Sequence, residues 1–243
     1  MNAARRSQTW ELGLIAAAVA LQSIHEATSY DAGFMYVDAV GIPAVLASTV
    51  LGIRSGVRVA AATAVGIWAL DASGSIGALL KLAATLSTML ALRFTTTRAA
   101  ILLAGLSTFL AAGGTALTLR LLGGATLYLG VAAVAAPVVA ATVASRAEAP
   151  GGAAATVPPP LPVSRWFVAL AGAVLLRGSL MVAGDLFFAV PVFFHEAAAD
   201  AMRAYPPATI LLWNGVQAAV DGLAALVVAR VASGRRAAAA VAG

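Results

Sequence analysis

The sequence predicts an all-α protein that crosses a membrane several times, and three observations lead to this fold class. Of the 243 residues, 61% are hydrophobic and only 10% are charged, whereas soluble domains carry about 25% charged residues. The apolar residues form long runs without the alternation that is typical of strands. Because lipid offers the backbone no hydrogen-bond partner, such runs form helices when they lie in a membrane.

Eight apolar segments are expected, and the first two differ in length. Residues 10–27 follow Arg5 and Arg6 and fit a retained first helix better than a cleaved signal peptide. Residues 42–53 are too few to span, since crossing the hydrocarbon takes roughly 20 residues. A short segment after an acidic loop, here with Asp38, suggests a site that opens into the membrane from one side. The eight segments are residues 10–27, 42–53, 56–71, 76–93, 99–120, 125–145, 165–190 and 207–233.

The placement of arginines predicts the orientation of these segments. If the N-terminus is cytoplasmic and each segment crosses once, eleven arginines face the cytoplasm and two face outward, as the positive-inside rule requires. The chain is therefore expected in the cell (plasma) membrane, multi-pass, with both termini cytoplasmic. Basic residues placed between apolar runs do not indicate nucleic-acid binding. The inward arginines are Arg5, Arg6, Arg54, Arg58, Arg93, Arg98, Arg146, Arg165, Arg230, Arg235 and Arg236; the outward ones are Arg120 and Arg203.

Four charged residues lie well within apolar segments, away from the segment ends: Lys81, Arg177, Asp185 and Asp221. An ionisable group at mid-membrane costs about 2.5–3.5 kcal/mol, so each is a candidate for function. Asp185 is the expected partner of Lys81, because pairing would relieve both desolvation penalties. The pair either contacts a polar ligand or fixes the register of two helices. Arg177 either snorkels toward the interface or joins this network.

Polar and aromatic residues give two further groups of candidates. Asn214, Gln217 and Asp221 share one face of the last segment through i, i+3 and i+4 spacing. That face lines either a ligand pocket or a helix–helix contact. Aromatic residues, among them Tyr36 and Phe188, form either an interfacial belt or a stacking pocket for a planar heterocycle.

The motifs that would indicate catalysis are missing from the sequence. It contains no His-Glu-x-x-His, Gly-x-Ser-x-Gly or P-loop pattern, so no hydrolytic activity and no ATP hydrolysis by this chain alone is expected. With no cysteine, a thiolate metal site is excluded. The dipeptides His25-Glu26 and His195-Glu196 are only a weak signal for a metal, and neither a metal nor a cofactor is expected.

An ordered set of motifs resembles the S-component, the substrate-binding subunit, of energy-coupling-factor (ECF) vitamin transporters, with the riboflavin-type members most similar. The resemblance covers about residues 10–93 and 165–233. It rests on order and spacing more than on identity. The motifs are Asp38-x4-Pro43, Gly52-x3-Gly56, Gly77-x3-Lys81, Gly184-Asp185-Leu-Phe-Phe-Ala-Val-Pro191 and Trp213-Asn214.

The resemblance implies one membrane domain, residues 1–243, with a six-helix core. Residues 94–145 are then an inserted helical hairpin, or include one in-plane helix, and residues 146–164 are a cytoplasmic linker rich in Pro and Gly. It also implies a non-enzymatic subunit that binds a vitamin, riboflavin or a related flavin, from outside. Its partners would be the lipid bilayer, a transmembrane coupling subunit and two cytoplasmic ATPase subunits.

The resemblance further implies which residues contact the ligand and the coupling subunit. Ala16 and Ala20 form a small-residue face on the first segment that allows close helix approach, and this face would dock on the coupling subunit. The residues expected to bind substrate are Asp38, Tyr36, Lys81, Asp185, Phe188, Asn214 and Gln217.

Three departures from the family pattern keep alternatives open. Lys81 and Asp185 stand where the family has asparagine, and Gln217 stands where it has lysine. The ligand could therefore be another small heterocyclic vitamin or a nucleobase-like compound. A membrane-embedded enzyme that uses Lys81 and Asp185 as acid–base groups is a second class, and a purely structural subunit is a third.

Overall fold

The computed structural model describes residues 3–24, 27, 29–31, 36–70, 74–94, 126–147 and 163–242. In these residues the chain is almost entirely helical, with one short antiparallel pair of strands, β1 (Tyr30–Asp31) and β2 (Tyr36–Val37). The helices are α1 (Ala3–Ser23), α3 (Ile42–Leu51), α4 (Ile53–Leu70), α5 (Gly74–Phe94), α8 (Thr126–Ala147), α10 (Val163–Gly184), the π-helix η2 (Asp185–Phe194), α11 (Ala198–Ala204) and α12 (Pro207–Ala242).

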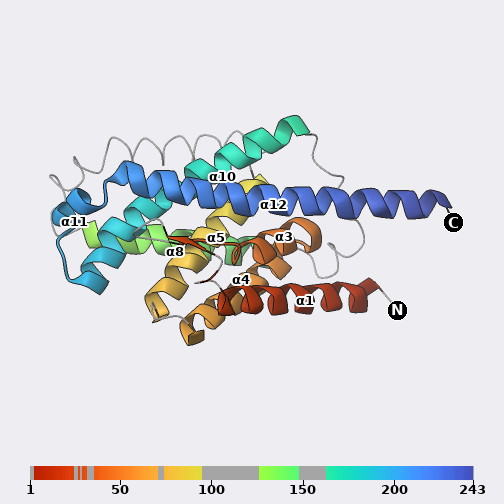
Figure 1. Ribbon diagram of the computed structural model, residues 1–243, viewed down its shortest axis with the longest axis horizontal. Helices are drawn as coiled ribbons and strands as arrows, with labels where there is room; N and C mark the ends of the chain where they lie inside the picture. Colours follow the sequence, from red (N-terminus) through yellow and green to blue (C-terminus); the bar gives the residue numbers. More distant parts are fainter. Residues whose placement is uncertain are drawn as a thin grey trace.

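The helices form one elongated bundle (Figure 1). Helix α12 runs along the length of the molecule with α10 packed beside it, and α1 lies on the other side against α4 and α3. Helix α5 contacts α10, α4 and α8, so it occupies the middle of the bundle. The N-terminus and the C-terminus lie at the same end.

Five helices in the described part of the chain are long and apolar enough to cross a membrane. They are α4, α5, α8, α10 continued by η2, and α12. The prediction of an all-α protein with membrane-spanning helices is confirmed to this extent. Of the predicted hairpin in residues 94–145, the second segment is helix α8, whereas segment 99–120 lies outside the described residues, as does most of the linker 146–164.

Several boundaries differ from the prediction. Helix α1 begins at Ala3 and α12 continues to Ala242, both beyond the apolar segments. Alanine and arginine dominate these extensions, and both have high helix propensity. The segment expected to end at residue 190 continues to Phe194, in a π-helical pattern that includes Pro191. Such π-helical turns are often found at functional sites.

A glycine turn folds the short helix α3 back along α4. Gly52 joins the two helices with a φ of 103°, which glycine adopts without a steric penalty. A Cβ on Gly56 would lie 2.6 Å from the Cβ of Ser48, so the two backbones are in direct contact. A helix of ten residues is only about 15 Å long. The loop before α3 therefore enters the bundle and reaches Gln217 in the first half of α12.

Glycines also bring α10 and α12 together as an antiparallel pair. A Cβ on Gly178 would lie 3.0 Å from the backbone oxygen of Leu211, and one on Gly215 would lie 2.9 Å from the Val174 side chain. Further along, Arg230 lies 5.7 Å from the ring of Trp166, a cation–π contact near the other end of the pair. The close approach holds α10 and α12 in one register, which positions the charged residues that they carry.

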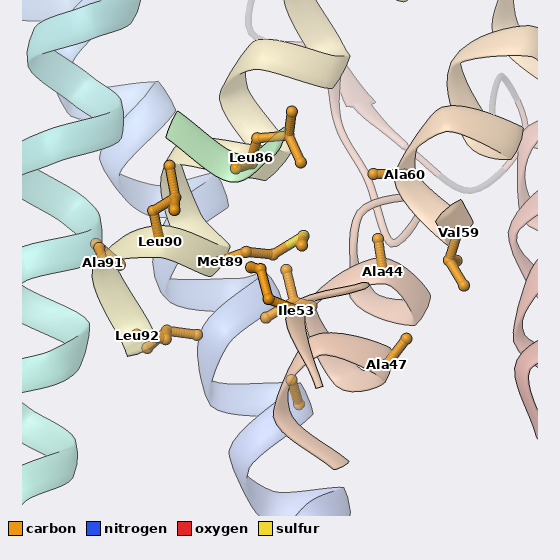
Figure 2. Packing of buried hydrophobic residues seen from close by; sticks show 14 of the residues in the cluster. Ala44, Ala47, Ile53, Val59, Ala60, Leu86, Met89, Leu90, Ala91 and Leu92 are labelled. Carbon is orange, nitrogen blue, oxygen red and sulfur yellow. The ribbon is translucent and has the colours of Figure 1, made fainter. Parts of the chain in front are cut away.

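The main hydrophobic core lies where α3, α4 and α5 meet, and Figure 2 shows its packing. Ile53 is fully buried, and Leu86 and Met89 of α5 extend toward α3 and α4. Alanines such as Ala44 and Ala47 let the helices approach closely. A second cluster joins η2, α11 and α12. The loop before α3 is thus attached to a rigid, well-packed unit.

Candidate functional site

Five polar side chains from four parts of the chain form one connected network inside the bundle. Asp38 lies in the loop before α3, Lys81 on α5, Arg177 on α10, and Gln217 and Asp221 on α12. Arg177, Gln217 and Asp221 are each at most 1% exposed. The network contains two cations and two carboxylates, so it is neutral when all four are ionised. Neutrality lowers the cost of placing charged groups in an apolar bundle.

Gln217 binds the backbone of Asp38 in the way that a neighbouring strand would. The backbone N–H of Asp38 donates to Gln217 Oε1 over 2.8 Å, and Gln217 Nε2 donates back to the Asp38 carbonyl oxygen over 2.7 Å. A backbone group inside an apolar bundle needs a partner, because leaving it unpaired and away from water costs free energy. The side-chain amide therefore holds the loop inside the bundle.

Asp221 and Arg177 hold the amide of Gln217 in place. Gln217 Nε2 donates its second hydrogen to Asp221 Oδ1 over 2.8 Å, and Arg177 Nη1 donates to Asp221 Oδ2 over 2.9 Å. The spacing of Gln217 and Asp221 by four residues puts both on one face of α12. The prediction of an inward-facing polar stripe agrees with this arrangement. Arg177 Nε is buried and has no hydrogen-bond partner.

Lys81 forms its ion pair with Asp38, not with Asp185 as the sequence had suggested. Lys81 Nζ donates to Asp38 Oδ1 over 2.7 Å, and the same oxygen accepts the backbone N–H of Val40 over 2.9 Å. The predicted helix contact does exist, because a Cβ on Gly184, next to Asp185, would lie 3.8 Å from the Leu80 side chain. The predicted pairing is wrong because the loop reaches deep enough to offer Lys81 a nearer carboxylate.

Gly41 lets the loop come close to Asp221. A Cβ at this position would lie 2.5 Å from Asp221 Oδ2, which is too close for any side chain without movement of the carboxylate. The backbone of Gly41 is α-helical, with φ −75° and ψ −24°, so space and not conformation requires glycine here. In the sequence this contact is marked only by a glycine next to Ile42 and Pro43.

Of the other predicted substrate-binding residues, those whose side chains are described form no hydrogen bond or ion pair with this network. Asn214 is buried and donates to the carbonyl oxygen of Ile210 in its own helix over 3.1 Å. Asp185 and Phe188 are half-buried on η2, which packs against α8. Tyr36 lies in β2, and its side chain is outside the described part of the structure. The structure thus brings together three of the predicted residues, Asp38, Lys81 and Gln217.

Accessibility divides the network into a sealed part and an open part. The side chains of Arg177 and Asp221 are 2% and 0% exposed, whereas those of Lys81 and Asp38 are 14% and 9% exposed. A small molecule could therefore meet the network at the Lys81–Asp38 pair. When an ammonium and a carboxylate that contact each other separate, each can form a hydrogen bond with a polar group of a ligand instead.

Two other predictions concern α1 and metal binding. Ala16 and Ala20 are exposed, a Cβ on Gly13 would meet nothing within 4 Å, and Ala18 on another face is fully buried. Among the described residues, no group of three or more His, Asp or Glu side chains could hold a metal ion. His25 lies outside the described residues, and His195 lies beyond the end of η2 with a φ of 55°.

Comparisons with protein-family profiles, with curated proteins and with solved structures found no match to this chain.

Proposed function

We propose that this chain is the substrate-binding membrane subunit of an ECF-type importer of a small heterocyclic vitamin. The observation that carries the proposal is the loop before α3, which enters the bundle and is held there by Lys81 and Gln217. A loop bound by a few polar contacts can cover a pocket and open when those contacts break. The partly exposed Lys81–Asp38 pair supplies the polar groups that a ligand would contact. Riboflavin is the first ligand to test, because the sequence most resembles the riboflavin-type members.

The orientation in the plasma membrane belongs to this proposal. Both termini lie at one end of the bundle (Figure 1). Arg58 pairs with Glu11 in the first half of α1, and Arg230 lies against Trp166 in the second half of α12. An arginine-rich end is the cytoplasmic end under the positive-inside rule. The loop and the Lys81–Asp38 pair would then be reached from outside.

The proposed partners are a transmembrane coupling subunit and two cytoplasmic ATPase subunits. Ala16, Ala20 and Gly13 form an exposed face of small residues on α1, and such faces allow a second helix to approach closely. Replacing Ala16 with Leu should block this approach without disturbing α4, because Ala16 lies on the exposed face. Loss of co-purification of the coupling module with Ala16→Leu, with retention in Arg203→Ala on α11, would support the contact.

The proposal is tested by measuring whether vitamins stabilise the purified chain. A ligand that binds only the folded state raises the unfolding temperature, by an amount that grows with its concentration. We expect stabilisation at micromolar concentration of one vitamin, and recovery of that vitamin by mass spectrometry from protein purified without added ligand. Lys81→Met should weaken binding, and Arg203→Ala, which changes a side chain that is 84% exposed, should not. Absence of stabilisation by every vitamin tested would contradict the proposal.

The enzyme alternative rested on an acid–base pair of Lys81 and Asp185. Lys81 instead contacts Asp38, so the geometry lends this alternative no support. The purely structural alternative predicts that Lys81→Met and Asp38→Asn change stability but no ligand affinity, and the same binding experiment distinguishes it.

A further inference from the structure

An arginine stands at or near one boundary of each long apolar helix in the described part of the chain. The apolar spans of α5 and α8 end at Arg93 and Arg146, and the span of α10 begins at Arg165. Arg54 directly follows the first residue of the α4 span, and Arg230 lies in the last turn of the α12 span. The opposite boundaries, at residues 70, 74, 126, 194 and 207, are uncharged. Helix ends that carry arginine are expected at the same membrane surface.

Contacts join the arginine-bearing boundaries of α4, α5 and α8. Arg54 Nε donates to the carbonyl oxygen of Ser145 over 3.0 Å, so the start of α4 lies beside the end of α8. A Cβ on Gly56 would lie 2.6 Å from the Cε of Met89, which puts the same part of α4 against the second half of α5. These three helices therefore present their arginines at one end of the bundle.

The start of α10 and the end of the α12 span belong to the same end. A Cβ on Gly222 of α12 would lie 3.5 Å from the Leu92 side chain, near the end of α5. The Cζ of Arg230 lies 5.7 Å from the centroid of the Trp166 ring, and Trp166 directly follows Arg165 on α10. Tryptophan is enriched where a membrane meets water, and this position agrees with that preference.

Positive charge dominates this end of the bundle. Arg165 is exposed and forms no ion pair with a described residue. Glu11 of α1 is paired with Arg58, and Asp221 of α12 is paired with Arg177. The arginines at the helix boundaries thus give this end a net positive charge, which attracts anions.

The surface beside Arg165 and Arg230 is apolar. Val168 follows Arg165 by three residues and Val227 precedes Arg230 by three, so each valine shares a helix face with its arginine. Both valines lie toward the middle of the apolar spans, and they are 46% and 45% exposed. A phospholipid can use both the charged and the apolar part of such a surface, whereas a soluble anion can use only the arginines.

We propose that Arg165 and Arg230 bind the headgroup phosphate of an anionic phospholipid. Its acyl chains lie against Val168 and Val227, one turn closer to the middle of the membrane. A guanidinium matches the oxygens of a phosphate with its N–H groups and can stack on an aromatic ring as well, and the position of Arg230 over the Trp166 ring allows both contacts. This lipid site goes beyond the importer proposal and does not depend on which vitamin binds.

The test measures the unfolding temperature of the full chain in detergent while dioleoylphosphatidylglycerol or zwitterionic dioleoylphosphatidylcholine is added. A lipid that binds the folded state raises this temperature, and the titration gives its apparent affinity. The variant Arg165→Gln with Arg230→Gln removes both charges of the site. The matched control is Arg58→Gln with Arg203→Gln, because it removes the same net charge from two exposed side chains elsewhere in the bundle.

We expect phosphatidylglycerol to stabilise the wild type and the control, and phosphatidylcholine to have little effect. The contribution of one arginine near an anionic lipid corresponds to about fivefold in affinity, so the double variant should bind phosphatidylglycerol about 25-fold more weakly. Arg165→Gln alone should weaken binding by about fivefold. Because its side chain is exposed, this single variant should fold even where the double variant does not.

Four results would overturn the lipid proposal. Equal stabilisation by the two lipids would show that the headgroup charge is not recognised. Unchanged affinity for phosphatidylglycerol in the Arg165 variants would show that this site does not bind it, and equal weakening in the control would show that overall charge is sufficient. Full stabilisation by millimolar inorganic phosphate would indicate a site for the free anion. None of the variants alters the network around Asp38, so failure of the importer proposal would leave the lipid result unchanged.

Discussion

Two ion pairs hold different helices of this protein together, and they lie in opposite surroundings. Arg177 and Asp221 join α10 to α12, and their side chains are 2% and 0% exposed. Arg58 and Glu11 join α4 to α1, and their side chains are 61% and 15% exposed. The first pair belongs to the network that holds the loop before α3. The second is supported by the hydroxyl of Ser55, which donates to Glu11 Oε2 over 2.7 Å.

Burial determines how much stability the protein loses when one partner of an ion pair is removed. An exposed pair contributes about 0–1 kcal/mol, because water and salt replace either partner. Removing one partner of a buried pair leaves a charge without compensation and costs about 3–5 kcal/mol. The buried pair also orients Asp221 for its hydrogen bond with Gln217, which in turn binds the loop before α3. Removing Arg177 should therefore also weaken the attachment of this loop.

Arg177→Met should destabilise the protein most, by about 3–5 kcal/mol, because it leaves the carboxylate of Asp221 buried and unpaired. The double variant Arg177→Met with Asp221→Leu should recover much of the loss, since it removes both charges. The measurement is the unfolding temperature in detergent. A double variant that is less stable than the single one would contradict the view that the unpaired charge is the cause.

Gln217→Leu should cost about 2–3 kcal/mol, because the N–H and carbonyl oxygen of Asp38 lose their partners inside the bundle. Hydrogen exchange at residues 38–41 should become faster. Asn214→Leu is the matched control, since Asn214 lies on the same helix and, among the described residues, its side chain bonds to Ile210 and not to the loop. Equal rates of hydrogen exchange at residues 38–41 in Gln217→Leu and Asn214→Leu would show that the amide of Gln217 does not hold the loop.

Gly41→Ala should cost about 1–2 kcal/mol through overpacking, because the new Cβ forces the Asp221 carboxylate away from Arg177. Gly13→Ala is the control, since a Cβ there meets nothing within 4 Å, and it should be neutral or slightly stabilising. Combining Gly41→Ala with Asp221→Ala should remove the steric part of the effect. The unfolding temperatures of the wild type, Gly41→Ala, Asp221→Ala and the double variant measure this coupling. Purely additive shifts would contradict it.

Arg58→Ala should have the smallest effect, below about 1 kcal/mol, because its guanidinium is mostly in solvent. The effect should shrink further at high salt, which screens exposed charges. Arg203→Ala, which breaks an even more exposed ion pair, is the reference for the loss of stability expected from a solvent-exposed pair. A loss for Arg58→Ala as large as that for Arg177→Met would show that burial does not govern the two pairs.

The sequence was sufficient to predict the fold class and most of the helices. Composition and long apolar runs require helices in a membrane, and the short segment before Gly52 is helix α3. The sequence also indicated that Lys81, Arg177, Gln217 and Asp221 carry the polar chemistry, because charged and amide side chains inside apolar segments stand out. These predictions depend on local composition and spacing, which a linear sequence contains in full.

Only the tertiary structure decided which of these residues meet. Lys81 contacts Asp38 and leaves Asp185 without an ion-pair partner among the described residues, because the short α3 lets its preceding loop enter the bundle. Gln217 binds a backbone segment 179 positions away, and Gly41 allows Asp221 to approach that segment. The depth of a loop depends on helix lengths, on close packing at glycines and on the register of α10 and α12. Those quantities arise from contacts across the whole bundle, so no local pattern in the sequence could have assigned the pairs.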